Sequence, residues 1–425
     1  MIQSFHKINK VNGALNFQGD KSISHRALLI SSLADGKSII RNLSDSEDVK
    51  STINCLNELG IKIELNKNDA IVFGKGFRGY QQPTNALNAR NSGTTARLLS
   101  GIVASQNFES IIIGDESLSS RPMKRIIDPL NQMGVIIESN NGKLPIKIFP
   151  VNKLQEIKYQ MPVASAQVKS AILFAGLHIY EPTTVVETVQ TRNHTENLLD
   201  LSVVRKGSDI RSSVSRINYP EPKEYFIPGD ISSAMFFIVL ALLTKNSELV
   251  VKNISLNATR IECLNLLKRM GGNIQVEERG VSNNEAYGDI IVKSSELSNV
   301  KIAQEIIPLI IDELPILAVA GVFAEGDFEL RGASELRVKE SDRIKAICTN
   351  LLKIGLDVEE YDDGFKVAGK IHKLSKPFES FGDHRIAMAF TILSSLLEAG
   401  GMVEGFDYAS ISNPEFISQL HSISI

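Results

Sequence analysis

The chain has 425 residues, of which 43% are hydrophobic and 22% charged, a composition typical of a folded globular protein with two or more domains. Its 46 lysines and arginines stand against 49 aspartates and glutamates, a net charge of −3 that argues against a nucleic-acid-binding surface. The three cysteines, Cys55, Cys263 and Cys348, lie singly in apolar stretches and are expected to be buried, reduced thiols.

The N-terminal segment, MIQSFHKINKVNG, lacks the apolar core of a signal peptide. The longest apolar run, AMFFIVLALL from Ala234, is too short to cross a bilayer. We therefore expect a cytoplasmic protein that binds neither a membrane nor nucleic acid.

One pattern of elements recurs six times along the chain, at intervals of about 70 residues. Each copy has a small-residue-rich apolar helix, a turn, a short strand and a polar loop, and in several copies a second helix follows. The copies begin near Ser24, Thr95, Ser165, Ser232, Asp312 and His384. Helical periodicity alternates with strand-like runs such as IKIEL, which predicts an α/β fold. Since one copy cannot bury its apolar face alone, the copies should pack together and their helix-start loops can converge on one cleft.

The six copies divide evenly about residue 228. The stretch NYPEPKEYFIPGD at residues 218–230 is rich in proline and is expected to be the crossover between two similar lobes.

Charged and polar residues gather where the repeats turn into their helices. In GDKSISHR, Ser22 and Ser24 are expected to cap the first helix, whose N-terminus would attract an anion. The candidates are Lys21, Ser22 and Arg26 in GDKSISHR; Asn91, Gly93, Thr94 and Arg97 in NARNSGTTAR; Arg121 in SSRPMKR; Ser165, Gln167 and Lys169 in SAQVKSA; Arg192 and His194 in QTRNHTE; Asp312; Lys339, Glu340 and Arg343 in ELRVKESDR; and Asp383, His384 and Arg385 in GDHRIAMA. Each alone fits a helix cap or a surface ion pair equally well. Together, at equivalent corners of repeated units, they predict a shared site.

Several arginines and lysines at one site indicate substrates that carry phosphates or carboxylates. Asp312 and Glu340 are the candidate proton carriers. The chain has no HExxH, no CxxC and no GxGxxG after a strand, so neither a metal nor a cofactor is expected. The residues predict acid–base chemistry between two small anionic molecules.

These motifs resemble, in the same order and over nearly the whole chain, those of the 5-enolpyruvylshikimate-3-phosphate (EPSP) synthases. The matching segments are GDKSISHR, NSGTTAR, SSRPMKR, SAQVKSA, VKESDRI and DHRIAMA. Within that family, four patterns resemble the class II bacterial enzymes: SAQxK at residues 165–169, RxHTE at 192–196, GDxSS at 229–233 and NxTR at 257–260.

The resemblance implies two lobes of three βαβαββ units each, with the active site between them. One lobe would comprise residues 20–228, the other residues 1–19 and 229–425, with a hinge at the two crossings. It also implies a monomer that transfers the enolpyruvyl group of phosphoenolpyruvate to the 5-hydroxyl of shikimate 3-phosphate and releases phosphate.

The resemblance further assigns roles to individual residues. Asp312 would accept the 5-hydroxyl proton, Glu340 would protonate the methylene carbon, and Lys21 would join them as a catalytic residue. Shikimate 3-phosphate would be bound by Lys21, Ser22, Arg26, Ser165, Ala166, Gln167, Arg192, Asp312 and Lys339. Phosphoenolpyruvate would be bound by Lys21, Asn91, Gly93, Arg121, Gln167, Arg343 and Arg385. The inhibitor glyphosate would compete at the same place, against Gly93.

One position departs from the family pattern: many relatives carry a lysine where this chain has Ile411, so that cation is absent or supplied elsewhere. Two alternatives remain beside the main interpretation. The sister enzyme that acts on UDP-N-acetylglucosamine carries a cysteine on the loop where this chain has Glu116. A non-catalytic anion-binding repeat protein would need the cations but has no use for Asp312 and Glu340 together.

Overall fold

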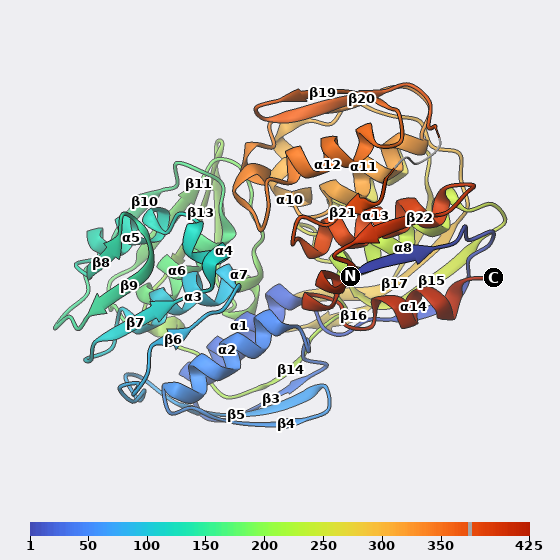
Figure 1. The fold of residues 1–425 in the computed structure, drawn as a ribbon. Helices are drawn as coiled ribbons and strands as arrows, with labels where there is room; N and C mark the ends of the chain where they lie inside the picture. The colour runs from blue at the N-terminus through green and yellow to red at the C-terminus, as the bar shows by residue number, and fades with distance from the viewer. Residues whose placement is uncertain (373–375) are drawn as a thin grey trace. The chain divides into compact units, whose positions relative to one another are not determined.

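The computed structural model describes residues 1–372 and 376–425, which form two compact units (Figure 1). Unit 1 comprises Met1–Phe17, Gly229–Gly280 and Ala286–Ile425, and unit 2 comprises Gln18–Pro228 and Val281–Glu285. The described residues form six sheets, and helices alternate with strands along the chain, so the predicted α/β fold of repeated units is confirmed.

Unit 2 contains three four-stranded sheets that share one pattern, a parallel pair at one edge followed by two antiparallel pairs. Their orders are β14-β3-β5-β4, β6-β7-β9-β8 and β10-β11-β13-β12. The strands are β3 (Asp35–Arg41), β4 (Lys62–Asn66), β5 (Asp69–Lys75), β6 (Leu87–Asn88), β7 (Ser110–Ile113), β8 (Ile136–Asn140), β9 (Lys143–Phe149), β10 (Lys158–Gln160), β11 (Thr183–Glu187), β12 (Val203–Lys206), β13 (Asp209–Val214) and β14 (Glu224–Phe226). The helices are α1 (Lys21–Leu33), α2 (Glu47–Glu58), α3 (Gly93–Val103), α4 (Glu116–Ser120), α5 (Lys124–Gln132), α6 (Ala166–Gly176), α7 (His194–Leu198) and the 3-10 helix η1 (Arg216–Asn218).

Unit 1 also contains three sheets, with orders β16-β17-β15-β2, β18-β20-β19 and β1-β22-β21. The first and third have a parallel pair at one edge, whereas both pairs of β18-β20-β19 are antiparallel. The strands are β1 (Ile2–Phe5), β2 (Asn12–Asn16), β15 (Glu248–Ser255), β16 (Asn273–Ser282), β17 (Glu285–Lys293), β18 (Phe328–Leu330), β19 (Asp357–Tyr361), β20 (Gly364–Ala368), β21 (Phe378–Glu379) and β22 (Gly401–Glu404). The helices are α8 (Ile231–Leu243), α9 (Glu262–Arg269), α10 (Ile307–Ile310), α11 (Leu314–Phe323), α12 (Arg343–Leu352), α13 (His384–Leu396), α14 (Phe416–Ile423) and the 3-10 helices η2 (Gln304–Ile306), η3 (Ser334–Val338) and η4 (Phe406–Ile411).

Two strands have exchanged places between the repeats. Strand β2 directly precedes α1 in the chain but pairs in parallel with β15 of unit 1, with Leu15 opposite Val251. Strand β14 directly precedes α8 but pairs in parallel with β3 of unit 2, with Tyr225 opposite Ile40. N-terminal strand β1 likewise pairs with β22, near the C-terminus, as Figure 1 shows in blue and red. The sheets of unit 1 are therefore completed by the first residues of the chain.

The first helix of each repeat forms the interior of its unit: α1, α3 and α6 in unit 2, and α8, α11 and α13 in unit 1. Helix α8 is apolar around its circumference and buries every residue from Ile231 to Leu242, as expected for a core helix. Helices α3 and α6 approach closely, because a β-carbon on Gly101 would lie 2.1 Å from the carbonyl oxygen of Ala171. All six predicted repeat helices are present, and the cysteines are free and buried as predicted.

The predicted caps of α1 were wrong. Asp20, not Ser22 or Ser24, caps the helix, and its carboxylate accepts a hydrogen bond from the backbone N–H of Ile23 at 3.0 Å. Aspartates that follow a glycine cap three further helices: Asp115 of α4, Asp230 of α8 and Asp383 of α13. A Gly-Asp pair therefore starts four helices of this chain, although Gly288-Asp289 lies within β17 and Gly326-Asp327 precedes β18. In α1 the serines behind the pair lie in the first turns of the helix.

Within residues 1–372 and 376–425, no single helix has the length and apolar composition needed to span a bilayer. The bent pair Gln304–Ile310 and Leu314–Phe323 meets the test of length and composition only when its two parts are taken together.

A cluster of rings holds the C-terminal end of α6. The ring of His178 lies 5.3 Å from that of Phe77 and 5.4 Å from that of Tyr219, and the Arg216 guanidinium is 3.8 Å from the Phe77 centroid. Neither ring nitrogen of His178 has a hydrogen-bond partner among the described residues. Burial, together with the positive charges of Arg78 and Arg216, lowers the pKa of His178 to about 3.

This lowered pKa makes stability depend on pH. Since the unfolded chain takes up a proton near pH 6.5 and the folded chain does not, the contribution of neutral His178 is complete above that pH and is lost as the pH falls towards 3. We expect His178→Phe to flatten the decline in unfolding free energy between pH 6.5 and 4.5 by up to about 1.4 kcal/mol per pH unit. Denaturant titrations at each pH measure this slope.

The matched control is His421→Gln, a substitution at an exposed histidine that should keep the wild-type slope. Equal slopes for His178→Phe and wild type would contradict the prediction.

Candidate active site

The predicted substrate-binding residues divide between the two units. Unit 2 holds Lys21, Ser22, Arg26, Asn91, Gly93, Arg121, Ser165, Ala166, Gln167 and Arg192, and unit 1 holds Asp312, Lys339, Glu340, Arg343 and Arg385. Many lie in the first turn of a helix: Lys21, Gly93, Ala166 and Arg343 begin α1, α3, α6 and α12, and Arg385 is the second residue of α13. Backbone N–H groups and the positive end of the helix dipole favour anions at these positions.

Lys21 is held by a carboxylate from the neighbouring helix. Its ammonium nitrogen lies 2.8 Å from Oδ2 of Asp48 on α2, and both side chains are less than one-fifth exposed. The sequence analysis did not single out Asp48, because nothing local links it to Lys21.

Arg26 is fixed by three hydrogen bonds within unit 2. Its Nε donates to the Thr195 hydroxyl at 2.8 Å, Nη2 to the Ser170 hydroxyl at 2.9 Å and Nη1 to the Ser22 carbonyl oxygen at 2.9 Å. The two hydroxyls bond to each other at 2.7 Å. Burial lowers the pKa of Arg26 to about 10, although the Glu196 carboxylate acts in the opposite direction.

A buried ion cluster lies behind these hydroxyls. The Lys169 ammonium is 2.7 Å from Glu196 and 3.2 Å from Glu187, and all three side chains are at most 3% exposed. Lys169 precedes Ser170 on α6 and Glu196 follows Thr195 on α7, so the ion pair ties together the helices whose hydroxyls hold Arg26. The motifs SAQxK and RxHTE meet at this point.

Gln167 is oriented by residues of α3. Its Oε1 accepts from Nη1 of Arg97 at 2.6 Å, and its Nε2 donates to the Thr94 hydroxyl at 2.9 Å. A β-carbon on Gly93 would lie 3.0 Å from the same Nη1 of Arg97, so the glycine leaves room for this guanidinium.

Asn91 and Arg121, both predicted for one substrate, contact each other. Nη2 of Arg121 donates to Oδ1 of Asn91 at 2.7 Å and to the Ser117 hydroxyl at 3.1 Å. Asn91 in turn donates to Oδ2 of Asp115 at 2.7 Å, so the carboxylate that caps α4 also orients the amide. The backbone of Arg121 is extended, with ψ of 147°, as the following proline predicts.

The remaining predicted residues of unit 2 surround the N-terminus of α6. Ser165 caps this helix and accepts from the backbone N–H of Val168 at 3.4 Å, and Ala166 is its first residue. Arg192 lies in the turn before α7, close enough for its charge to help lower the pKa of Arg26.

In unit 1, Arg343 joins three carboxylates. Its Nε lies 2.7 Å from Asp383, its Nη2 2.5 Å from Glu340 and its Nη1 3.5 Å from Asp312. Burial acts against the charge of Arg343, yet Asp383, Glu340 and Asp312 together raise its pKa. Burial alone would raise the pKa of Asp383, but the charge of Arg343 acts the other way, and the pKa of Asp383 is lowered. Arg343 is 1% exposed, whereas Glu340 and Asp312 are 23% and 16% exposed and can reach a ligand.

Asp312 is surrounded by cations. Its carboxylate lies 3.6 Å from Nζ of Lys339 and 3.8 Å from Nη2 of Arg385, in addition to the contact with Arg343. The Asp312 backbone carbonyl also accepts a hydrogen bond from Nη1 of Arg385 at 2.8 Å. The structure therefore brings together all five site residues predicted for unit 1.

The two groups differ in charge. The unit 2 residues are mainly cations and helix N-termini, which suit phosphate and carboxylate binding. The unit 1 group places two partly exposed carboxylates on one guanidinium, an arrangement suited to proton transfer beside bound anions. No group of three or more His, Cys, Asp or Glu side chains that could hold a metal ion occurs among the described residues.

The sequence analysis missed the side chains that hold the predicted ones in place. Asp48, Ser170, Thr195 and Asp115 each contact a site residue from a different element, and Ser117 contacts Arg121 at the end of its own helix. Only Asp115 had a local signal, because it follows a glycine at a helix start as Asp20 does.

Comparison with known proteins identifies the family. The family model of EPSP synthase (3-phosphoshikimate 1-carboxyvinyltransferase) matches residues 5–420. The 3-phosphoshikimate 1-carboxyvinyltransferase of Petrotoga mobilis is 46% identical over 417 residues, which cover 96% of this chain and 95% of that protein. The enzyme of the same name from Syntrophomonas wolfei is 42% identical over 424 residues, 98% of each chain.

Solved structures agree with this result. An EPSP synthase from Acinetobacter baumannii superimposes with a TM-score of 0.86 at 36% identity and covers 100% of this chain and 98% of its own. The enolpyruvyl transferase NikO from Streptomyces tendae has a TM-score of 0.73 over 99% of this chain and 97% of its own, but at 15% identity it shows only a shared fold. The chain therefore belongs to the EPSP synthase family.

Proposed function

We propose that this chain catalyses the reaction for which its family is named, transfer of the carboxyvinyl (enolpyruvyl) group of phosphoenolpyruvate to shikimate 3-phosphate. The new ether bond forms at the 5-hydroxyl, and phosphate is released. The observation that carries the proposal is that both candidate proton carriers, Asp312 and Glu340, contact the single guanidinium of Arg343.

The two alternatives fit less well. The relatives at 46% and 42% identity over the full chain bear the EPSP synthase name, not that of the enzyme that acts on UDP-N-acetylglucosamine. That enzyme's loop cysteine is replaced by Glu116. A non-catalytic anion-binding protein would not need Asp312 and Glu340 on one buried cation.

We assign the binding of shikimate 3-phosphate mainly to unit 2. Ser22 and Arg26 would bind the carboxylate, and the N-terminus of α6, with Ser165, Ala166 and Arg192, would bind the phosphate. In support, Ser165 caps α6 and Ala166 is its first residue, so the helix begins at these two positions. Gln167, held by Arg97 and Thr94, would lie under the ring.

Phosphoenolpyruvate would be bound by cations and helix starts from both units. Unit 2 would contribute Lys21, Asn91, Gly93, Arg121 and Gln167, and unit 1 would contribute Arg343 and Arg385. Lys339, 3.6 Å from Asp312, would bridge the two substrates. This division requires the units to act together, with the chain crossings near residues 17–18 and 228–229 as the hinge. We further propose that the enzyme is a monomer that works in the cytoplasm.

The proton steps then follow from the two carboxylates. Asp312 accepts the proton of the 5-hydroxyl as its oxygen attacks C2 of phosphoenolpyruvate, and protonated Glu340 gives its proton to the methylene carbon. While the proton is being transferred and the new C–O bond is still incomplete, C2 carries oxocarbenium character beside a carboxylate and a phosphate, and fixed cations hold these two anionic groups in place. When the bond from C2 to the phosphate oxygen breaks, Glu340 takes back a proton from the methyl group and the vinyl group is restored. The proton that Asp312 accepted leaves with the phosphate, so both carboxylates return to their starting states.

The direct test is phosphate release from a mixture of shikimate 3-phosphate and phosphoenolpyruvate, with each substrate omitted in turn. We expect release only when both are present, and none when UDP-N-acetylglucosamine replaces shikimate 3-phosphate. Release with the sugar nucleotide alone as acceptor, or no release with either acceptor, would overturn the proposal.

The carboxylate assignment predicts that Asp312→Asn and Glu340→Gln each lower kcat by roughly 10²- to 10⁴-fold, the usual worth of a positioned acid or base. The affinity for shikimate 3-phosphate, measured by calorimetry, should change only a few-fold because the cations remain. Glu305→Gln, at an exposed position on η2, is the control and should keep wild-type kcat. Turnover within a few-fold of wild type in either site variant would refute that residue's role.

The glycine at position 93 leads to a prediction for glyphosate, an inhibitor that is longer than phosphoenolpyruvate. A methyl group at this position would meet Nη1 of Arg97 at 3.0 Å and Cδ1 of Leu118 at 3.5 Å, which would crowd the site. Since overpacking costs about 1–3 kcal/mol, Gly93→Ala should weaken inhibition by glyphosate about 5- to 150-fold and phosphoenolpyruvate binding less. The measurement is the inhibition constant of glyphosate for wild type and for Gly93→Ala, at the same concentration of phosphoenolpyruvate. Equal constants would show that Gly93 does not line the inhibitor site.

A further inference from the structure

Glu313 is a buried carboxylate beside Asp312 that the proposed reaction does not use. Its side chain is 0% exposed, and its Oε1 accepts a short hydrogen bond from the Ser232 hydroxyl. Its Oε2 is buried and has no hydrogen-bond partner in the described part of the chain. A buried charge held by one hydroxyl is costly unless a cation lies close by, so its surroundings require an explanation.

Ser232 links Glu313 to a buried arginine. Nη2 of Arg260 donates to the Ser232 hydroxyl at 2.7 Å and lies 3.3 Å from Oδ1 of Asp230. Because arginine cannot accept a hydrogen bond, the serine proton is left to point at Glu313. The motifs GDxSS and NxTR therefore meet in a directed chain, from Arg260 through Ser232 to Glu313.

Arg385 is the second cation near Glu313. Its Nη1 lies 3.8 Å from Oε1 of Glu313, and its Nη2 lies 3.8 Å from Oδ2 of Asp312. Both separations are too long for a hydrogen bond. Within residues 1–372 and 376–425, its guanidinium makes one hydrogen bond, from Nη1 to the carbonyl oxygen of Asp312 at 2.8 Å.

The positive charge of Arg385 is thus balanced by two carboxylates that accept no hydrogen bond from its guanidinium. If Glu313 could rotate, its carboxylate would move onto Nη1 and form a direct ion pair. The hydrogen bond from Ser232 holds the carboxylate back, so the remaining guanidinium N–H groups stay available.

We propose that Glu313 is a positioning residue for Arg385 and that Ser232 and Arg260 fix Glu313 in that role. Its charge keeps the guanidinium of Arg385 at the start of α13, with its donors left for the carboxylate or phosphate of phosphoenolpyruvate. The proposal rests on the proposed function and deepens it, because it explains how an arginine of the donor-substrate site stays both neutralised and unoccupied.

The variant Glu313→Gln keeps the shape of the side chain and removes its charge. Arg385 would then be drawn towards Asp312, the remaining carboxylate beside it. We expect the KM for phosphoenolpyruvate to rise about 5- to 50-fold, with kcat within about fivefold and the KM for shikimate 3-phosphate within about twofold of wild type. A merely structural role would instead lower the unfolding temperature and change both KM values together.

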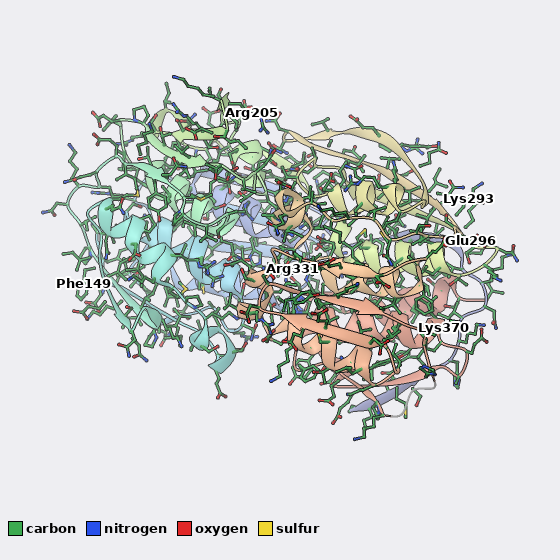
Figure 2. All side chains as sticks on the ribbon, turned by 90° about the horizontal axis from the view of Figure 1, so that it is seen from above. Phe149, Arg205, Lys293, Glu296, Arg331 and Lys370 are labelled. Carbon is green, nitrogen blue, oxygen red and sulfur yellow. The ribbon has the colours of Figure 1, made fainter. Side chains whose placement is uncertain are left out.

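Substitutions at Ser232 test the same link without removing the carboxylate. Ser232→Ala frees Glu313 to form a direct ion pair with Arg385 and should raise the KM for phosphoenolpyruvate in the same way. Ser232→Thr keeps a hydroxyl at this position and should therefore keep the wild-type KM. Ser233→Ala, at the adjacent buried serine, is the matched control. Glu296→Gln removes a charge from an exposed side chain, labelled in Figure 2, and should also behave as wild type.

Calorimetric binding of phosphoenolpyruvate in the presence of shikimate 3-phosphate supplies a readout that does not need turnover. If wild type binds phosphoenolpyruvate but releases no phosphate, the proposed function fails while the comparison of dissociation constants still tests Glu313. If Glu313→Gln does not fold, the Ser232 variants decide. The inference is overturned if Ser232→Ala and the folded Glu313→Gln bind phosphoenolpyruvate as wild type does, or if wild type does not bind it.

Discussion

A cation that must bind an anionic substrate cannot be neutralised by partners that use all its donors. Three buried arginines that we propose as substrate ligands meet this constraint in different ways. Arg26 donates to two hydroxyls and a carbonyl, with the carboxylates set one layer behind. Arg343 pairs directly with Asp383 and shares its other nitrogens between the carboxylates of Glu340 and Asp312. Arg385 donates to a carbonyl while Glu313 stays 3.8 Å away. In the first and last cases the neutral oxygens position the guanidinium and the carboxylates balance its charge.

The repeated architecture places these cations. Each core helix is apolar over most of its length and is therefore buried, so only its first turn can carry polar function. Gly-Asp pairs end the preceding loops and cap α1, α8 and α13 with carboxylates. Repetition of one helix-start design thus produces several polar helix ends. Divergence at the positions after the cap, such as lysine in α1 and arginine in α13, makes each end specific.

Much of this could be predicted from the sequence because the signals were local. Six apolar helices, their starting points and the polar residues of their first turns follow from periodicity and from Gly-Asp and Gly-Thr segments. The cap of α1 was misplaced because serine and aspartate compete for the same position and the pattern alone does not rank them. The partners could not be predicted. Asp48 for Lys21, Thr195 for Arg26 and Ser232 for Glu313 lie on other elements, and only the packing of helices brings them together.

The exchange of β2 and β14 has a consequence for how the protein forms during synthesis. Apart from Val281–Glu285, unit 2 is one continuous stretch, Gln18–Pro228. Nearly all of its strands therefore leave the ribosome before most of unit 1 has been made, and before unit 1 can begin to fold. Unit 1 needs β1 and β2 from the first 17 residues of the chain, yet their partners, β22 and β15, are made only later. Pairings of such sequence separation are slow to form, because a long loop must close before any contact stabilises it. During that interval the earliest-made strands remain unpaired edges, which makes the N-terminal segment the part of the nascent chain most exposed to wrong partners.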